Sequence, residues 1–310
     1  MEYGNISMAG GSERRVSRLV LGTALYGSAI SRDAAFEMMD IFFEHGGNAL
    51  DSARVYASWL PNGVDASERT VGEWIRSRGV EKEVFLITKG AHPKHFENMR
   101  LPRLSREEIE SDIARSMEVL GTPIDLYFLH RDDRNRPVSD IMTTLSGLVG
   151  KGYVRAIGAS NWFVDRIGEA NAWADAKGAP RFTASQIQWS YADFRASVTD
   201  DTLVGMDEAE LAGYEKMERM AVMAFSSQAK GVFSCGYAPD LSDVQPKHRA
   251  YVSEENIIRY QRLLAVCRRD HVRPERVALE YITKNTRVNG FAVIGASRKE
   301  QLVSTLTAME

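Results

Sequence analysis

Four polar residues of complementary chemistry lie at or just after the ends of short apolar runs. Asp51, Lys89 and His130 each end such a run, and Tyr56 follows Asp51 by five residues. A tyrosine in water has a pKa of about 10 and is a reluctant acid at neutral pH. A nearby ammonium lowers that pKa, and a neutral histidine hydrogen-bonds a substrate oxygen or relays a proton. The set therefore suits proton delivery to a carbonyl oxygen during its reduction.

Each residue also has a simpler explanation. A polar side chain at a strand end can satisfy backbone groups, and an unpaired buried Lys89 would cost several kcal/mol, which gives Asp51 a structural reason to lie beside it. Coincidence explains one such residue more easily than three at consecutive strand ends. We therefore expect Asp51, Tyr56, Lys89 and His130 to meet in space.

The elements that must position these residues alternate between short apolar runs and longer amphipathic segments. Alternation predicts a parallel sheet because parallel strands need crossover helices. Eight units favour a (β/α)₈ barrel, whose active sites lie where the strand carboxyl ends converge. The expected strands are Arg18–Thr23, Asn48–Ser52, Glu83–Lys89, Asp125–His130, Val154–Gly158, Phe182–Gln186, Met220–Phe225 and Phe291–Ile294. The expected helices are Ser31–His45, Ser67–Arg78, Ser105–Gly121, Val138–Gly150 and a last helix from about Lys299.

Local signals refine this architecture. Ser105 and Glu108 have the spacing of a capping box. Residues Met1–Arg15 are expected to form a short β-hairpin that caps the bottom of the barrel. The irregular segments Gly90–Pro102 and Ser234–Arg249 are predicted to be long loops, which in compact domains are often functional.

Composition limits the classes of protein. The 310 residues, 44% hydrophobic and 26% charged, are expected to form one domain over residues 1–310. A net charge of −3 gives no reason to expect nucleic acid or an anionic membrane as partner. Cys235 and Cys267 form no C-x-x-C pair and are interpreted as packing residues, which favours a reducing cytoplasm. Residues Met1 to Gly11 do not resemble a signal peptide, and no apolar run is long enough to span a membrane.

Several segments resemble the aldo-keto reductases, in order from about Leu19 to Leu302. The resemblance implies a (β/α)₈ barrel that binds NADPH extended across its carboxyl-terminal rim, without a Rossmann domain. It also implies a catalytic tetrad at Asp51, Tyr56, Lys89 and His130, with Tyr56 as general acid. The segments that carry it are Asn48–Tyr56 (NALDSARVY), Phe85–Gly90 (FLITKG), Ile124–His130 (IDLYFLH), Val154–Trp162 (VRAIGASNW) and Val293–Leu302 (VIGASRKEQL).

The same resemblance assigns the remaining rim residues to the cofactor. Ser160, Asn161 and Gln186 are expected to hydrogen-bond the nicotinamide carboxamide, although Gln186 also suits a buried amide that serves backbone groups. Phe225 takes the place of a stacking tyrosine, and it stacks without donating a hydrogen bond. Further cofactor contacts are assigned to Gly22, Thr23, Ser226, Gln228, Lys230, Gly295, Ser297, Arg298 and Gln301.

The last strand-to-helix passage bears on the choice of cofactor. Free backbone N–H groups at a helix N-terminus attract phosphate, and Ser297 and Glu300 have capping-box spacing, which also explains both without a ligand. Arg298 adds a cation suited to a phosphate monoester. We therefore favour NADPH over NADH.

The chain departs from the family in two places. The run after Phe225 (SSQAKGVFS) differs from the commoner pattern, and the chain ends at Glu310, soon after the last helix. The short tail resembles bacterial-type members and leads us to expect an open pocket. Trp59 and Trp162 are candidate pocket walls, for which core or rim packing is an equal alternative, and Trp189 is interpreted as a packing residue.

Other functions remain to be weighed. His130–Asp132 begins like a kinase catalytic loop, but Pro137 stands where that loop needs asparagine. His92 and His95 flank Pro93 in an expected exposed loop, and we predict no metal site there. Two functions stay open, an enzyme that reduces an aldehyde or ketone or oxidises the alcohol, and a binding module that holds NADPH and regulates a partner. The natural substrate, the direction of reaction and the oligomeric state are not readable.

Overall fold

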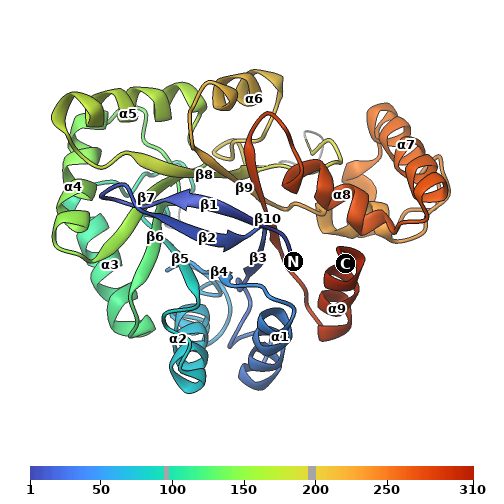
Figure 1. Cartoon of the computed structure of the whole chain (residues 1–310), viewed down its shortest axis with the longest axis horizontal. Coiled ribbons are helices and arrows are strands. Elements are labelled where there is room, and N and C mark those ends of the chain that lie inside the picture. The colour runs from blue at the N-terminus through green and yellow to red at the C-terminus, as the bar shows by residue number, and fades with distance from the viewer. Residues whose placement is uncertain (94–97, 195–199) are drawn as a thin grey trace.

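The computed structural model describes residues 1–93, 98–194 and 200–310. Eight parallel strands close into a barrel in the order β10-β3-β4-β5-β6-β7-β8-β9, as Figure 1 shows. The (β/α)₈ architecture expected from the sequence is thus confirmed. The barrel strands are β3 (Leu19–Gly22), β4 (Ala49–Asp51), β5 (Phe85–Gly90), β6 (Ile124–Leu129), β7 (Val154–Ser160), β8 (Phe182–Gln188), β9 (Ala221–Phe225) and β10 (Asn289–Ile294).

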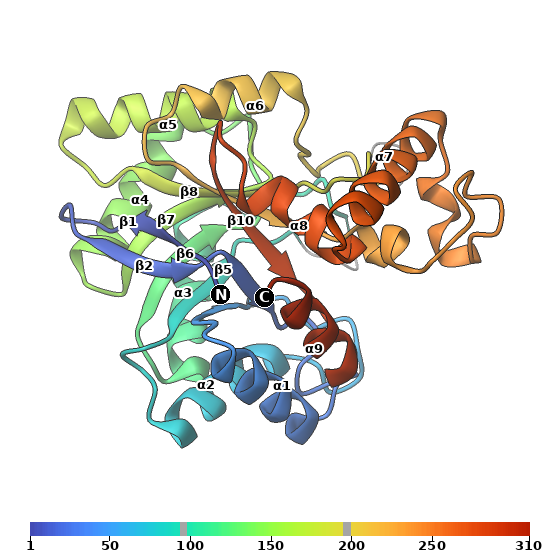
Figure 2. The same cartoon turned by 45° about the vertical axis from the view of Figure 1, so that its right-hand side comes forward.

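Helices surround the strands as an outer layer, and α7 stands out from the barrel beyond α8 (Figure 2). In the part of the chain that the structure describes, no helix has the length and apolar character needed to cross a membrane. The helices are α1 (Arg32–Glu44), α2 (Ala66–Arg78), α3 (Arg106–Leu120), α4 (Val138–Gly150), α5 (Val164–Lys177), α6 (Glu208–Glu215), α7 (Glu254–Asp270), α8 (Pro274–Thr283) and α9 (Lys299–Ala308), with short 3₁₀ segments η2 (Ala229–Ser234) and η3 (Pro246–Tyr251).

Helix ends follow the capping signals in most places. At α3 the Ser105 hydroxyl accepts from the Glu108 N–H, and the Glu108 carboxylate accepts from the Ser105 N–H, which confirms the capping box. The capping box predicted at Ser297 and Glu300 is wrong. Arg298 is the residue that precedes the first turn of α9, and the Ser297 hydroxyl and N–H both donate to the side chain of Gln301.

Strand ends were predicted less well than strand positions. The strand runs expected at Val154–Gly158 and Phe182–Gln186 are each two residues short, because the ladder continues to Ser160 and Gln188. Ser160 still pairs with Gln186. A polar side chain does not interrupt backbone pairing when the rim supplies partners for it, so side-chain polarity marks a strand end only within a few residues.

The N-terminal hairpin closes the bottom of the barrel, as expected. Strand β1 (Tyr3–Ser7) pairs antiparallel with β2 (Glu13–Ser17), and the pair crosses the amino ends of the barrel strands in Figure 1. Ile6 and Val16 are fully buried and share one apolar cluster with Phe85 of the barrel interior. The hairpin therefore covers the lower core and leaves the carboxyl-terminal rim to the polar residues.

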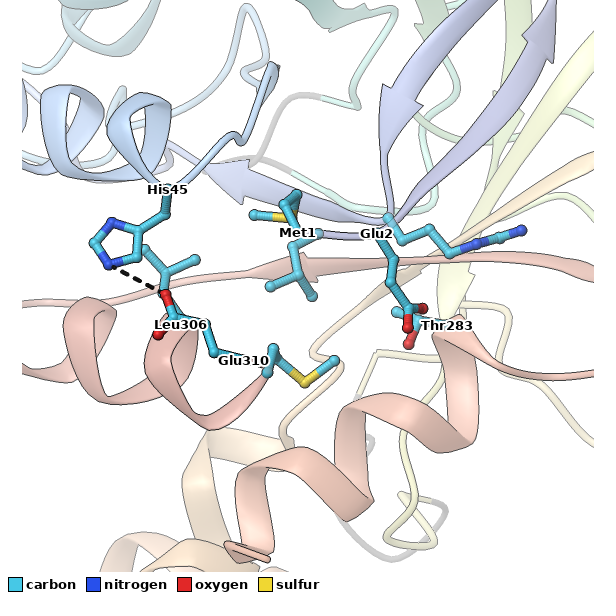
Figure 3. A pocket seen from close by; sticks show the side chains of 9 residues that line it. Met1, Glu2, His45, Thr283, Leu306 and Glu310 are labelled. Carbon is cyan, nitrogen blue, oxygen red and sulfur yellow. Dashed lines mark ion pairs between the residues drawn. The ribbon is translucent and has the colours of Figure 1, made fainter.

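A small pocket also lies at this lower end. It is bounded by Met1 and Glu2 and by helices α1, α8 and α9, and Figure 3 shows His45 facing Glu310 beside it, with His45 Nε2 and the carboxylate 3.8 Å apart. Leu19, at the amino end of β3, lines the pocket. The pocket thus lies at the end of the barrel opposite to the carboxyl end of β4, where Asp51 stands.

Candidate active site

A buried ion pair forms the centre of the carboxyl-terminal rim. Lys89 Nζ lies 2.7 Å from each oxygen of Asp51 and 2.9 Å from the carbonyl oxygen of Ser52. Both side chains are almost fully buried. Burial lowers the pKa of Lys89, and the Asp51 charge opposes that shift. Loss of either partner would leave an uncompensated buried charge, which typically costs about 3–5 kcal/mol.

Tyr56 reaches this pair because the loop after β4 folds back over the rim. The Arg54 N–H donates to the carbonyl of Lys89 at 2.8 Å, and the Tyr56 N–H donates to the carbonyl of Ala53 at 3.0 Å. The Tyr56 hydroxyl then lies 2.8 Å from Lys89 Nζ and 3.3 Å from Asp51 Oδ2. An ammonium has three N–H donors, and here they face the Asp51 carboxylate, one carbonyl and the phenol oxygen.

The pKa of Tyr56 differs from the expectation. Burial raises the pKa of Tyr56 well above its usual value, the Asp51 carboxylate raises it further, and the Arg131 charge lowers it. The prediction of a lowered pKa is therefore wrong for this arrangement. Because Asp51 already neutralises the ammonium, no net positive charge offsets the desolvation of a phenolate. Tyr56 consequently stays protonated at neutral pH and keeps a proton to donate.

His130 stands just past β6 on the same rim. Its ring centroid lies 6.0 Å from that of Tyr56, edge to face. Burial lowers the pKa of His130 well below its usual value, and the neighbouring His92, Arg131 and Lys89 lower it further. His130 Nδ1 is buried and has no hydrogen-bond partner among the residues that the structure describes. The ring is therefore neutral at neutral pH.

His92 takes part in this cluster and is buried, so the exposed position expected for it is wrong. Its ring packs edge to face on His130 with centroids 4.5 Å apart, and its Nδ1 lies 2.6 Å from the carbonyl oxygen of Pro93. His95 lies outside the described residues. The signal for His92 was its position two residues past the end of β5, which its apparent pairing with His95 obscured.

Ser160, Asn161 and Gln186 lie together where β7 and β8 end. Asn161 adopts a left-handed φ of 57°, and its Nδ2 donates to the Ser160 hydroxyl at 3.1 Å and to the His130 carbonyl at 3.2 Å. Gln186 Nε2 donates to Asp51 Oδ1 at 2.9 Å. The amide of Gln186 thus serves a carboxylate of the cluster rather than backbone groups, and Asn161 connects Ser160 to the backbone of His130.

The segment after β9 contains an unusual backbone. Ser226, Ala229 and Lys230 have φ values of 53°, 46° and 58°, a region that costs non-glycine residues energy and persists only when surrounding structure enforces it. Gln228 Nε2 donates weakly to Thr305 of α9 at 3.4 Å. Phe225 is partly exposed, whereas Ser226 and Lys230 are exposed.

The passage from β10 to α9 is open and positively charged. A side chain added at Gly295 would meet nothing within 4 Å. Arg298 is exposed, and neither its guanidinium nor the Lys230 ammonium has an ion-pair partner within the described part of the chain. Two solvent-facing cations beside a left-handed turn and a helix N-terminus fit the phosphates of a dinucleotide.

Gly22 and Thr23 end β3 beneath this surface. A Cβ at Gly22 would lie 3.2 Å from the side chain of Val293 and 3.3 Å from the carbonyl oxygen of Ile294. The Thr23 hydroxyl is fully buried, donates to the carbonyl of Asp51 at 3.0 Å and lies 2.9 Å from the Ser67 hydroxyl. Thr23 therefore ties β3 to β4, and its side chain does not face the rim surface.

Trp59, Trp162 and Trp189, three of the five tryptophans, have different environments. Trp162 is fully buried and packs edge to face on Phe182 at 5.3 Å, within the core between the barrel and its helices. Its assignment to the pocket wall is therefore corrected, because the strand end that displays Asn161 turns the next side chain outward. Trp189 is buried and contacts Tyr281, which confirms its packing role. Trp59 is 36% exposed in the loop that carries Tyr56.

Two further groups escaped sequence reasoning. Arg131 follows His130 directly and is only 7% exposed, and its side chain was given no role from the sequence, although the segment that begins at Arg131 was expected to shape the pocket. His248 is fully buried, and its ring nitrogens lie 2.7 Å from the Tyr237 hydroxyl and 3.0 Å from the Lys230 carbonyl. It lies in the predicted loop Ser234–Arg249, whose final residues form the start of η3. Lone buried residues in a loop carry no periodic signal.

Comparison with known proteins gives a consistent result. The sequence model of the aldo/keto reductase family matches residues 18–310. The chain is 28% identical to norsolorinic acid reductase of Emericella nidulans, over 95% of this chain and 74% of that protein. It is 27% identical to an uncharacterized oxidoreductase of Bacillus subtilis over 100% and 91%, and 26% identical to an aryl-alcohol dehydrogenase of Pestalotiopsis microspora over 95% and 75%.

Proposed function

The chain belongs to the aldo/keto reductase family, and from that premise we propose that it is an NADPH-dependent oxidoreductase. It reduces an aldehyde or ketone to the alcohol, or runs the reverse reaction, with Tyr56 as the general acid. The observation that carries the proposal is the contact of the Tyr56 hydroxyl with Lys89 at 2.8 Å and Asp51 at 3.3 Å. The family match over residues 18–310 supports a single domain.

Tyr56 donates its proton to the carbonyl oxygen of the substrate. Its pKa is raised by burial and by Asp51, so the phenol holds its proton until a negative charge develops on that oxygen. Lys89 donates a hydrogen bond to the phenol oxygen and stabilises the phenolate that remains. Asp51 keeps Lys89 charged, and neutral His130 orients the substrate oxygen.

The residues of the rim fit a nicotinamide dinucleotide. NADPH, when bound, supplies the hydride that reduces the carbonyl carbon. Ser160, Asn161 and Gln186 would hold the carboxamide, and Phe225 would stack on the ring. The groups that would hold the phosphates are Ser226, Gln228, Lys230, Gly295, Ser297, Arg298 and Gln301. Gly22, which packs against Val293 and Ile294, would lie below them.

The names of the relatives suggest a substrate class. One relative is called a norsolorinic acid reductase and another an aryl-alcohol dehydrogenase, so we propose aromatic carbonyl compounds or the matching alcohols as substrates. Trp59 is exposed beside Tyr56 and would offer an aromatic wall to such a ring. The free thiols of Cys235 and Cys267 agree with a reducing, cytoplasmic location.

A turnover screen tests the proposal. Purified protein is supplied with NADPH and with aromatic, aliphatic and sugar aldehydes, and cofactor oxidation is followed by absorbance at neutral pH. We expect steady oxidation, fastest with aromatic aldehydes and slower with NADH. Tight NADPH binding with no turnover on any aldehyde or alcohol would instead favour a module that binds the cofactor and regulates a partner.

A further inference from the structure

Arg131 brings a second buried cation to the rim. Its guanidinium lies under the segment that follows β8, where Nε donates to the Thr202 hydroxyl at 3.1 Å and Nη2 lies 3.4 Å from Asp200 Oδ2. Nη1 donates to the carbonyl of His130 at 2.9 Å. The charge of Arg131 acts on both Tyr56 and His130, so the guanidinium stands close to the groups that would meet the substrate.

The two buried cations of the rim are compensated unequally. Lys89 is held by both oxygens of Asp51 at 2.7 Å. Arg131 faces one oxygen of Asp200 at 3.4 Å, and the other oxygen of that carboxylate already accepts from the Thr202 hydroxyl at 2.6 Å and the Thr202 N–H at 2.9 Å. A buried charge is stable only when its hydrogen bonds and counter-charge are complete. The hydrogen bonds and the counter-charge of Arg131 are less complete than those of Lys89.

Some N–H donors of the Arg131 guanidinium have no partner among the described residues. A guanidinium carries five N–H groups in one plane, and three of those of Arg131 have partners among the described residues. One N–H on each terminal nitrogen is left. A guanidinium that has one N–H left on each terminal nitrogen can donate to both oxygens of a carboxylate.

We propose that Arg131 is a specificity-determining residue that binds a carboxylate of the substrate, so that the enzyme acts on carbonyl compounds that also carry an acid group. The inference rests on the proposed reductase function and names a substrate class for the same site. The Arg131 guanidinium donates to the His130 carbonyl, and its charge acts on both Tyr56 and His130, so the acid group would lie on the same side of the rim as the reacting carbonyl. With a neutral substrate of the same shape, Asp200 at 3.4 Å would be the counter-charge of the guanidinium among the described residues.

Matched substrates separate this role from a structural one. A benzaldehyde that carries a carboxylate at the meta position is compared with its methyl ester, and kcat/KM is measured for both in the wild-type protein and in Arg131→Gln. We expect the wild type to favour the acid by about tenfold or more, and Arg131→Gln to lose that preference because the acid then binds more weakly and its KM rises. Because the Arg131 charge also acts on Tyr56 and His130, its loss should change kcat for the acid and for the ester by the same factor, and the acid-to-ester ratio of kcat/KM is the readout of the carboxylate contact.

Two further variants serve as controls. Arg134→Gln removes an exposed arginine of the same loop, whose partner is Asp165, and should leave the acid preference unchanged. Asp200→Asn removes the competing carboxylate and should increase the preference for the acid. A purely structural Arg131 would make both substrates fall together in Arg131→Gln and in Asp200→Asn.

The outcomes distinguish this inference from the proposed function. If wild-type protein turns over both compounds equally, or if Arg131→Gln keeps a preference for the acid, the inference is overturned while the reductase proposal stands. If neither compound is turned over, calorimetric titration of both into protein with NADP⁺ decides. Tighter binding of the acid that disappears in Arg131→Gln supports the carboxylate site, and equal binding rejects it.

Discussion

The rim of the barrel has two halves that are organised in opposite ways. Where β4, β5 and β6 end, the groups proposed for chemistry are side chains that hold one another, with Lys89 between Asp51 and Tyr56. Where β9 and β10 end, the groups proposed for the cofactor are exposed, and Ser226 and Lys230 sit in a left-handed backbone. The first half is held by contacts among its own side chains. The second half must be held by residues that pack beneath it.

The support behind the second half can be identified. The Ser227 hydroxyl donates to the carbonyl of Val293 at 2.7 Å, and His248 contacts the carbonyl of Lys230 at 3.0 Å. A separate apolar cluster that includes Phe233 and Tyr260 packs beneath this segment. The difference implies that changes in the first half should affect the chemical step, whereas changes in the second half should affect cofactor binding.

Tyr56→Phe is the sharpest test of the first half. Removal of the hydroxyl takes away the proposed general acid, so kcat should fall by about 10² to 10⁴. The dissociation constant of NADPH, measured by fluorescence titration, should change by less than about threefold. Tyr153→Phe makes the same change at an exposed tyrosine just before β7 and should leave both values unchanged. Retained turnover in Tyr56→Phe would eliminate the acid role.

Arg298→Ala tests the second half and should have an intermediate effect. Loss of a charge-assisted contact to a phosphate monoester should raise the dissociation constant of NADPH by about tenfold. NADH, which lacks that phosphate, should bind as before, and kcat at saturating NADPH should not change. Lys299→Ala removes the adjacent cation, which pairs with Glu37 at 2.7 Å, and is the matched control. An unchanged preference between the two cofactors would contradict the assignment.

The first half of the rim was also the half that the sequence predicted best. Asp51, Lys89 and His130 end regular strands, and the convergence of parallel strand ends brings such residues together whatever the details of packing. Tyr56 was placed by its short distance from Asp51 along the chain. The raised pKa of Tyr56 was not predictable, because the balance between burial, Asp51 and Arg131 depends on distances of a few ångströms.

The second half was predicted only in outline. The left-handed residues Ala229 and Lys230 are not glycine, so no residue type marks the unusual backbone. Ser297 has the right spacing to cap a helix, yet it hydrogen-bonds the side chain of Gln301. Several acceptors lie within reach of one serine, and spacing does not determine which of them it contacts. His248 and Arg131 act through contacts with residues distant in the chain, and sequence spacing carries no information about those contacts.

Tyr237→Phe should give the smallest effect. It tests whether the residues beneath the second half hold its backbone in place. Burial lowers the pKa of His248, so its ring is neutral. A neutral ring has one N–H, which at Nε2 donates to the carbonyl of Lys230 and leaves Nδ1 to accept from the Tyr237 hydroxyl. Without that hydroxyl, Nδ1 loses the partner that holds the ring against the Lys230 carbonyl, and the turn at Lys230 relaxes.

NADPH should then bind about twofold to fivefold more weakly, with kcat at saturating NADPH unchanged. His248→Gln keeps an N–H donor for the carbonyl of Lys230 and should retain more affinity than His248→Leu, which has none. Thermal unfolding of each variant separates a local change from a general loss of stability. If Tyr237→Phe lowered kcat and left NADPH binding intact, the two halves of the rim would not be separable, and the comparison between them would have to be abandoned.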